Sequence, residues 1–161
     1  MDEVDEIVAA WRVERPDAEV TPLEVFSRLT RLAKHLERLR KQAFATHELE
    51  VWEWDVLSAL RRSGEPYELS PGQLVAATMV TSGTMTNRVD RLVSRGLVQR
   101  RPAPSDRRGV LVRLTADGRA RVDGALDTLL ALESAILEDL PEAEREHVAQ
   151  ALRTLTAHFN G

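Results

Sequence analysis

The chain has 161 residues, which suits one ordinary domain with a helical extension. Hydrophobic residues make up 43% and charged residues 30%, so a packed core is expected and a disordered chain is not. Cysteine is absent, which excludes disulfides, thiolate metal sites and cysteine nucleophiles. The first ten residues lack a signal-peptide pattern, and no apolar run approaches the roughly 18 residues that span a bilayer. We therefore expect a soluble, cytoplasmic protein without a membrane partner.

Basic residues are concentrated in one segment of the chain. Residues 81–115 contain eight arginines and two acids, a net charge of +6, whereas the remainder has fourteen basic and twenty-four acidic residues, a net charge of −10. The total of −4 alone argues against a nucleic-acid partner. A basic segment on an acidic body is nevertheless the pattern expected where one surface meets phosphate. We therefore expect this segment to contact double-stranded DNA.

Helical patterns dominate both ends of the chain. Residues 1–12 are amphipathic, a proline break follows at 15–17, and a long helix is predicted from Thr21. Apolar residues recur along that helix at spacings of four and three, a heptad seam that fits a partner helix. The seam residues are Val25, Leu29, Leu32, Leu36, Leu39 and Ala43. Residues 115–139 and a last helix from Pro141 carry similar stripes, so we expect a homodimer, with a monomeric bundle as the alternative.

The central region has the signals of a helix-turn-helix. Residues 50–62 are apolar nearly all round, which is typical of a buried helix. The Ser-Pro-Gly-Gln sequence at 70–73 is a capping box that starts a short helix. A turn at 78–80 follows, Thr81 caps a second helix, and Gly96 ends it in the left-handed conformation. Two helices joined by so short a turn predict a helix-turn-helix.

The second helix has two faces when it is unrolled at about 100° per residue. Met85, Val89, Leu92 and Val93 cluster on the side expected to face the core. Asparagine and arginine on the opposite side are the residue types that pair bidentately with adenine and guanine edges. The candidate DNA contacts on this helix are Ser82, Thr84, Thr86, Asn87 and Arg91. Arg88 lies on the flank, neither fully inward nor fully outward.

Two short segments with alternating polarity follow. Residues 97–101 and 110–114 read as paired strands, with a polar loop at 102–109 between them. Such a hairpin reaches past the helix-turn-helix, and an arginine at its tip suits the narrow, negative minor groove. The candidate DNA contacts at this tip are Asp106, Arg107 and Arg108. The aspartate cannot serve phosphate directly, so we expect it to orient one of the two arginines.

These elements predict a mainly α fold with a small β-hairpin. The architecture is a winged helix-turn-helix with N- and C-terminal dimerisation helices. We expect an extra helix and linker at 1–20, a helical dimerisation region at 21–48 and 116–161, and the DNA-binding domain at 49–115.

The same residues resemble the multiple-antibiotic-resistance regulator (MarR) family. The resemblance rests on Leu74 to Val80, the helix from Thr81 to Leu92, the Gly96-Leu97-Val98 exit, and Asp106-Arg107-Arg108-Gly109 leading to Leu114-Thr115. It extends from about Thr21 to Phe159. It implies a triangular dimer on a palindromic operator and repression relieved by ligand. It also implies that Arg108 enters the minor groove with Asp106 as its brace.

The added N-terminal helix resembles the urate-responsive branch of this family. That branch implies a ligand site at Trp11, Asp55, Arg88 and Arg100. Similar sequences respond to polycarboxylates such as citrate and aconitate, so both ligand classes stay open. The residue types themselves also indicate an anion site. A carboxylate such as Asp55 in an apolar helix needs a cation, which Arg88 can supply. An anion that takes over Arg88 would then move the second helix; a solvated edge position for Asp55 is the alternative.

Other functions have less support. The scattered histidines are His35, His47, His147 and His158. The sequence has no HExxH motif, phosphate-binding loop or Ser-His-Asp pattern, so we predict neither an enzyme nor a cofactor. A metal-responsive regulator is one alternative, although no metal-ligand spacing is present. A ligand-independent DNA-binding module, with Asp55 and Arg88 as a structural ion pair, is another.

Overall fold

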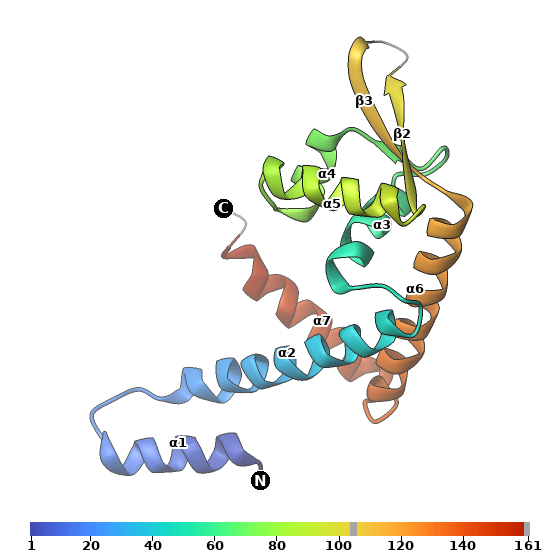
Figure 1. Ribbon diagram of the computed structural model, residues 1–161. Helices are drawn as coiled ribbons and strands as arrows, with labels where there is room; N and C mark the ends of the chain where they lie inside the picture. Colours follow the sequence, from blue (N-terminus) through green and yellow to red (C-terminus); the bar gives the residue numbers. More distant parts are fainter. Residues whose placement is uncertain (104–105, 160–161) are drawn as a thin grey trace. The chain divides into compact units, whose positions relative to one another are not determined.

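The computed structural model describes residues 1–103 and 106–159, and the side chains of residues 106–108 lie outside the description. Figure 1 shows the helices and strands along the chain. In order they are α1 (Glu3–Glu14), α2 (Thr21–Ala45), α3 (Val51–Arg62), β1 (Glu68–Leu69), α4 (Pro71–Thr78), α5 (Ser82–Ser94), β2 (Val98–Ala103), β3 (Asp106–Leu114), α6 (Ala116–Leu137) and α7 (Glu142–Ala157). The chain forms two compact units, Met1–Gln42 and Ala43–Gly161. The predicted fold class, mainly α with a small sheet, is confirmed.

The first unit contains the predicted N-terminal helix. The carboxylate of Asp2 accepts hydrogen bonds from the backbone N–H groups of Val4 and Asp5, and Asp5 returns one to the N–H of Asp2. This capping box satisfies backbone donors that the first turn of a helix leaves unpaired. Val4 and Val8 are buried together with Val20, so this half of the apolar stripe packs as the periodicity predicted, whereas Ile7 is half-buried and Trp11 is exposed.

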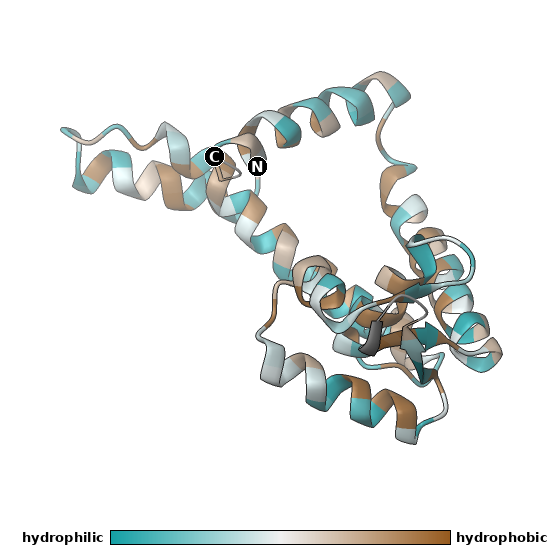
Figure 2. Cartoon of the chain, turned by 90° about the horizontal axis from the view of Figure 1, so that it is seen from above, coloured by the Kyte–Doolittle hydropathy of each residue, from teal (hydrophilic) through white to brown (hydrophobic). Residues whose placement is uncertain are grey.

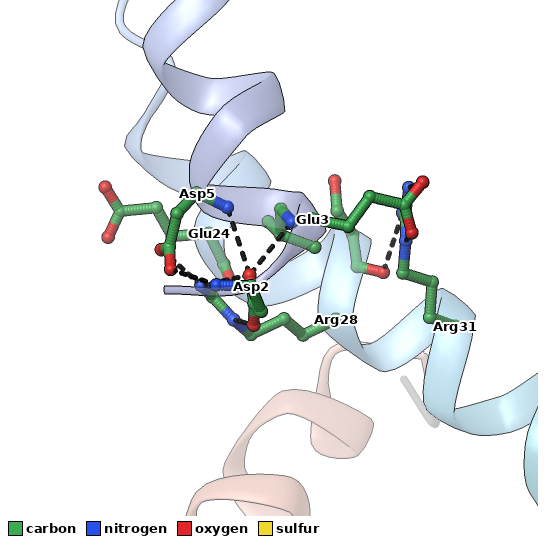
Figure 3. A network of polar contacts seen from close by, with 8 residues as sticks. Asp2, Glu3, Asp5, Glu24, Arg28 and Arg31 are labelled. Atoms are coloured by element: carbon green, nitrogen blue, oxygen red, sulfur yellow. Dashed lines mark hydrogen bonds and ion pairs between the residues drawn. The ribbon is translucent and has the colours of Figure 1, made fainter.

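Ion pairs join α1 to α2 within this unit (Figure 3). The Arg28 guanidinium lies 2.8 Å from Asp2 and 2.6 Å from Asp5, and Arg31 lies 3.1 Å from Glu3. The pKa of the Asp2 carboxyl is lowered from 3.8 to about 2. The largest cause is the hydrogen bond from Arg28, and the second is the hydrogen bond from the backbone N–H of Asp5. The pKa values of Glu3 and Asp5 are lowered as well. The acidic first turn of α1 is therefore matched by basic residues one turn apart on α2.

The helix-turn-helix in the second unit forms from local signals. Ser70 accepts from the N–H of Gln73 at 3.2 Å and Gln73 accepts from the N–H of Ser70 at 2.8 Å, which is the predicted capping box. The turn between α4 and α5 places Met79 at φ +52°, a left-handed conformation. Thr81 caps α5, and Gly96 follows it at φ +70°.

The sheet is larger than the predicted hairpin. Its strand order is β1-β3-β2, and both pairs are antiparallel. The loop predicted at 102–109 is wrong in extent, because pairing continues to Pro102 opposite Val110 and, after a bulge, to Ala103 opposite Asp106. Pro102 is tolerated there because β2 is an edge strand, where a missing backbone N–H costs little. The strand β1 was not predicted; it pairs Glu68 with Arg113.

The core of the second unit gathers one face from each of several elements. Its largest fully buried side chains include Phe44, Leu57, Leu60, Leu74, Met85, Leu92 and Leu97. Val93, which the helical wheel placed in the core, is 37% exposed instead. The helix at 50–62 is also less uniformly buried than predicted, because Trp52 is only half-buried while Glu53 is 1% exposed.

The start of α6 is fixed against the exit from α5. The Thr115 hydroxyl accepts from the N–H of Gly118 and itself lies 2.7 Å from the carbonyl oxygen of Gly96 and 3.0 Å from that of Leu97. A Cβ on Gly118 would lie only 2.1 Å from the carbonyl oxygen of Leu97. Glycine is therefore required at residue 118 for this close approach.

Candidate nucleic-acid interface

The outer side of α5 is positioned by the buried side of the same helix. Met85, Val89 and Leu92 are buried, which fixes the rotation of α5 about its axis. The candidate DNA contacts Ser82, Thr84, Thr86, Asn87 and Arg91 are all exposed. The hydroxyl of Thr86 donates back to the carbonyl oxygen of Ser82 at 3.0 Å, so it is partly satisfied within the helix. The fold leaves these polar side chains open to solvent.

A shallow hollow of about 290 Å³ opens on this side of α5. It is lined by Thr84, Asn87, Arg88 and Arg91 of α5 and by Trp52 of α3. A guanidinium only donates hydrogen bonds, whereas an asparagine amide both donates and accepts. The hollow therefore suits an acceptor-rich group, such as a phosphate or the edge of a guanine.

The Trp52 ring lies beneath two arginines. The Cζ atom of Arg91 lies 4.7 Å from the centre of the indole ring, and that of Arg88 lies 5.6 Å from it. The indole N–H donates to Glu50, and Arg91 lies 3.5 Å from the same carboxylate. The apolar pattern of residues 50–62 predicts that Trp52 lies in the core, and no local signal distinguishes it from Trp54 in that helix.

The candidate effector residues are distributed over both units. Trp11 is on α1 in the first unit and is 48% exposed. In the second unit, Asp55 is half-buried on α3 and Arg88 is half-buried on α5, in keeping with its predicted flank position. Arg100 lies on β2 and pairs with Asp90 of α5 at 2.6 Å. The structure thus brings Arg88 beside three of the DNA-contact candidates, in the hollow above Trp52.

The buried acid of α3 is Glu53. Its carboxylate is 2.5 Å from Nη1 of Arg95, which follows α5, and it also accepts from the backbone N–H of Glu50 at 2.9 Å. Nη2 of Arg95 donates to the carbonyl oxygen of Glu48 at 2.7 Å. This arginine joins the end of α5 to the start of α3. The expected buried carboxylate of this helix was Asp55, two residues further along, and Glu53 was missed.

The hairpin of β2 and β3 forms the wing. Its strands pair from Val98 opposite Leu114 out to Ala103 opposite Asp106, so the predicted hairpin is present. The wing candidates Asp106, Arg107 and Arg108 fall among the side chains that lie outside the described structure. Their contact with DNA stays a prediction from sequence.

A larger hollow, about 560 Å³, opens between residues 65–67, the end of β3 and the start of α6. It carries arginines, but these are engaged internally. Arg119 lies 3.7 Å from the carboxylate of Asp123, and Arg113 donates to the carbonyl oxygen of Pro66. The guanidiniums of Arg61 and Arg119 both lie about 5 Å from the Tyr67 ring, at 4.9 and 5.0 Å. We therefore place the candidate interface at the smaller hollow on α5.

The described residues also bear on two other possibilities, a metal site and a membrane-spanning helix. Among those residues, no group of three or more histidines and carboxylates is placed to hold a metal ion. Within residues 1–103 and 106–159, every helix is too short or too polar to span a lipid bilayer.

Comparison with known proteins supplies the family. Residues 47–109 match the sequence model of the MarR family. The chain is also 37% identical to the HTH-type transcriptional regulator PecS of Dickeya dadantii, over 98% of this chain and 95% of that protein. This chain belongs to the MarR family. It is a DNA-binding transcriptional regulator with a winged helix-turn-helix.

Solved MarR-family structures share its fold. A variant of MarR from E. coli complexed with operator DNA aligns with a TM-score of 0.69 and 28% identity, covering 84% of this chain and 94% of that one. BpsR of Bordetella bronchiseptica aligns with a TM-score of 0.67 and 30% identity, covering 82% and 92% of the two chains. The structure of BpsR concerns regulation of its DNA binding by 6-hydroxynicotinic acid.

Proposed function

We propose that this MarR-family protein is a ligand-responsive repressor that binds a palindromic operator as a homodimer and is released by a small anionic metabolite such as urate. The observation that carries the proposal is the grouping of Asn87, Arg88 and Arg91 in one exposed hollow on α5. It places residue types that read base edges next to an arginine that an anionic effector can engage.

Exposed apolar side chains support the homodimer. On α6 they are Leu126, Leu130, Leu132, Ile136 and Leu137, and on α7 they are Val148 and Leu152. Each of these is 38 to 50% exposed. Figure 2 colours the chain by hydropathy and shows hydrophobic residues alternating with hydrophilic ones along the helices. Monomeric soluble proteins rarely expose so many apolar side chains on adjacent helices, so a second copy of the chain is the expected cover.

Arg88 is the residue through which we expect the effector to act. A planar anion that draws the Arg88 guanidinium away from Trp52 changes the hollow in which Asn87 and Arg91 also lie. Trp11, Asp55 and Arg100 are the further proposed ligand residues. A dimer fits two half-sites about one helical turn apart, so a small change in either reading helix lowers operator affinity. Polycarboxylates such as citrate are the second candidate class, because they offer the same charge to Arg88.

Substitutions at the interface test DNA reading by this face and by the wing. Operator affinity is measured by fluorescence anisotropy over a range of salt concentrations. We expect Asn87→Ala and Arg91→Ala to weaken binding, each by about 1–3 kcal/mol if it contacts a base. Arg108→Ala should weaken binding and make the salt dependence shallower by about one unit. The control is Arg153→Ala, which removes an exposed arginine of α7, outside both α5 and the wing. Unchanged operator affinity in Asn87→Ala and Arg91→Ala would contradict DNA reading by α5, and unchanged affinity in Arg108→Ala would contradict DNA contact by the wing.

A further inference from the structure

The arginines of the basic segment are held by two different kinds of partner. Arg95 and Arg100 pair with carboxylates at 2.5 and 2.6 Å, which cancels much of their charge. Arg88 and Arg91 lie over the face of Trp52, and Arg91 also makes a longer, exposed ion pair with Glu50 at 3.5 Å. An aromatic face attracts a cation through its quadrupole and carries no net charge of its own. The ring therefore holds these arginines without offsetting their charge, and the exposed pair with Glu50 offsets only part of the charge of Arg91.

The position of the indole is itself fixed. Trp52 is in the first turn of α3, and its N–H donates to Glu50, the residue that caps this helix. The next residue, Glu53, is buried and paired with Arg95 at the end of α5. The ring is therefore attached to a helix whose place relative to α5 is set by a buried contact.

We propose that Trp52 is a positioning residue for DNA reading: its uncharged ring face holds the Arg91 guanidinium in place, beside Arg88, the residue proposed to engage the effector. The Arg91 side chain is 63% exposed, and a long exposed side chain loses rotamer freedom when it binds. Because the indole restricts Arg91 before DNA arrives, less of that freedom remains to be lost in the complex. The proposal rests on the proposed DNA-reading role of α5.

The test is a double-mutant cycle on operator affinity, measured with the full-length protein. Trp52→Leu is expected to weaken binding about three- to tenfold, as the loss of one or two cation–π contacts predicts. The same substitution in an Arg88→Ala/Arg91→Ala background should have almost no further effect, because the ring then has no guanidinium to hold. Trp52→Phe, which keeps a ring face, should recover most of the affinity. Circular dichroism and thermal unfolding show whether each variant is folded.

Salt dependence separates positioning from charge. Trp52→Leu leaves every arginine present, so the slope of affinity against salt should match that of the unmodified protein, whereas Arg91→Ala should make it shallower. Glu50→Gln keeps an acceptor for the indole N–H and removes the carboxylate beside Arg91. We expect it to tighten binding about two- to fivefold, in line with an exposed ion pair.

Three results decide the proposal. If Trp52→Leu weakens binding equally in the presence and absence of the two arginines, the ring acts on the fold and the proposal is wrong. If Glu50→Gln weakens binding, the carboxylate and not the ring holds Arg91, which also overturns it. If the arginine substitutions themselves leave affinity unchanged, the proposed reading face fails first, and that outcome is distinct from the other two.

Discussion

Glu53 and Arg95 form a pair in which one partner is buried and the other is not. The Glu53 side chain is 1% exposed, whereas that of Arg95 is 37% exposed, and the two lie 2.5 Å apart. Glu53 lies on α3, and Arg95 is the residue that follows α5. The pair therefore joins the end of α5 to the start of α3. The desolvation cost falls mainly on the carboxylate, and only a close cation offsets it.

This asymmetry predicts unequal effects of the two single substitutions. Arg95→Met leaves the buried Glu53 carboxylate without its cation and is expected to lower the free energy of unfolding by about 3–5 kcal/mol. Glu53→Gln leaves Arg95 in contact with water and should cost less, about 1–3 kcal/mol. Urea unfolding followed by circular dichroism measures both. The reverse order would mean that the guanidinium is the buried half of the pair in solution.

The contact between α6 and the exit from α5 predicts that Gly118→Ala is destabilising. Gly118→Ala places a Cβ 2.1 Å from the carbonyl oxygen of Leu97, so backbone must shift. We expect a loss of about 1–3 kcal/mol in unfolding free energy, the usual range for an overpacked site. Gly83→Ala on α5 is the matched control, because its Cβ meets nothing within 4 Å. That variant should gain stability, since alanine favours a helix over glycine by about 1 kcal/mol.

The ion pairs of the first unit predict how its stability depends on pH. The hydrogen bond from Arg28 and those from backbone N–H groups lower the pKa of Asp2 from its ordinary 3.8 to about 2, so its stabilising contribution is present above about pH 4 and is lost as the pH falls through about 2. A carboxyl ¹³C titration should give a midpoint near 2 for Asp2. Arg28→Gln should return the midpoint toward the ordinary aspartate value. An unshifted midpoint in the unmodified protein would show that Arg28 and Asp2 are not paired in solution.

Features with a local cause were predictable from the sequence. The Ser70 and Thr81 caps, the left-handed Gly96 and the Thr115 cap each depend on residues within four positions of one another, and all are present. The buried face of α5 followed in the same way from helical periodicity. Only Val93, at the margin of that face, proved more exposed than predicted.

Features that depend on distant partners were not predictable. The strand β1 has two residues and exists because Glu68 meets Arg113, 45 positions away in the sequence by their numbers. Glu53 and Asp55 are both acids in an apolar helix, and burial selects Glu53 because Arg95 reaches it across 42 positions. Trp52 likewise takes its surroundings from α5 and not from its own helix. Spacing within one helix carries none of this information.

The most direct test of the account is release of operator DNA by an anionic effector. Fluorescence anisotropy on DNA upstream of the protein's own gene, at fixed salt, is followed while urate, xanthine, citrate or trans-aconitate is added. We expect at least one of these anions to release the operator. In the Arg88→Ala variant, operator affinity should be the same with and without that anion. Release by a purine supports the site at Trp11, Asp55, Arg88 and Arg100, and release only by polycarboxylates keeps the arginines but reduces Trp11 to packing. Operator binding that none of these anions alters, or an Arg88→Ala variant that releases normally, would contradict the account.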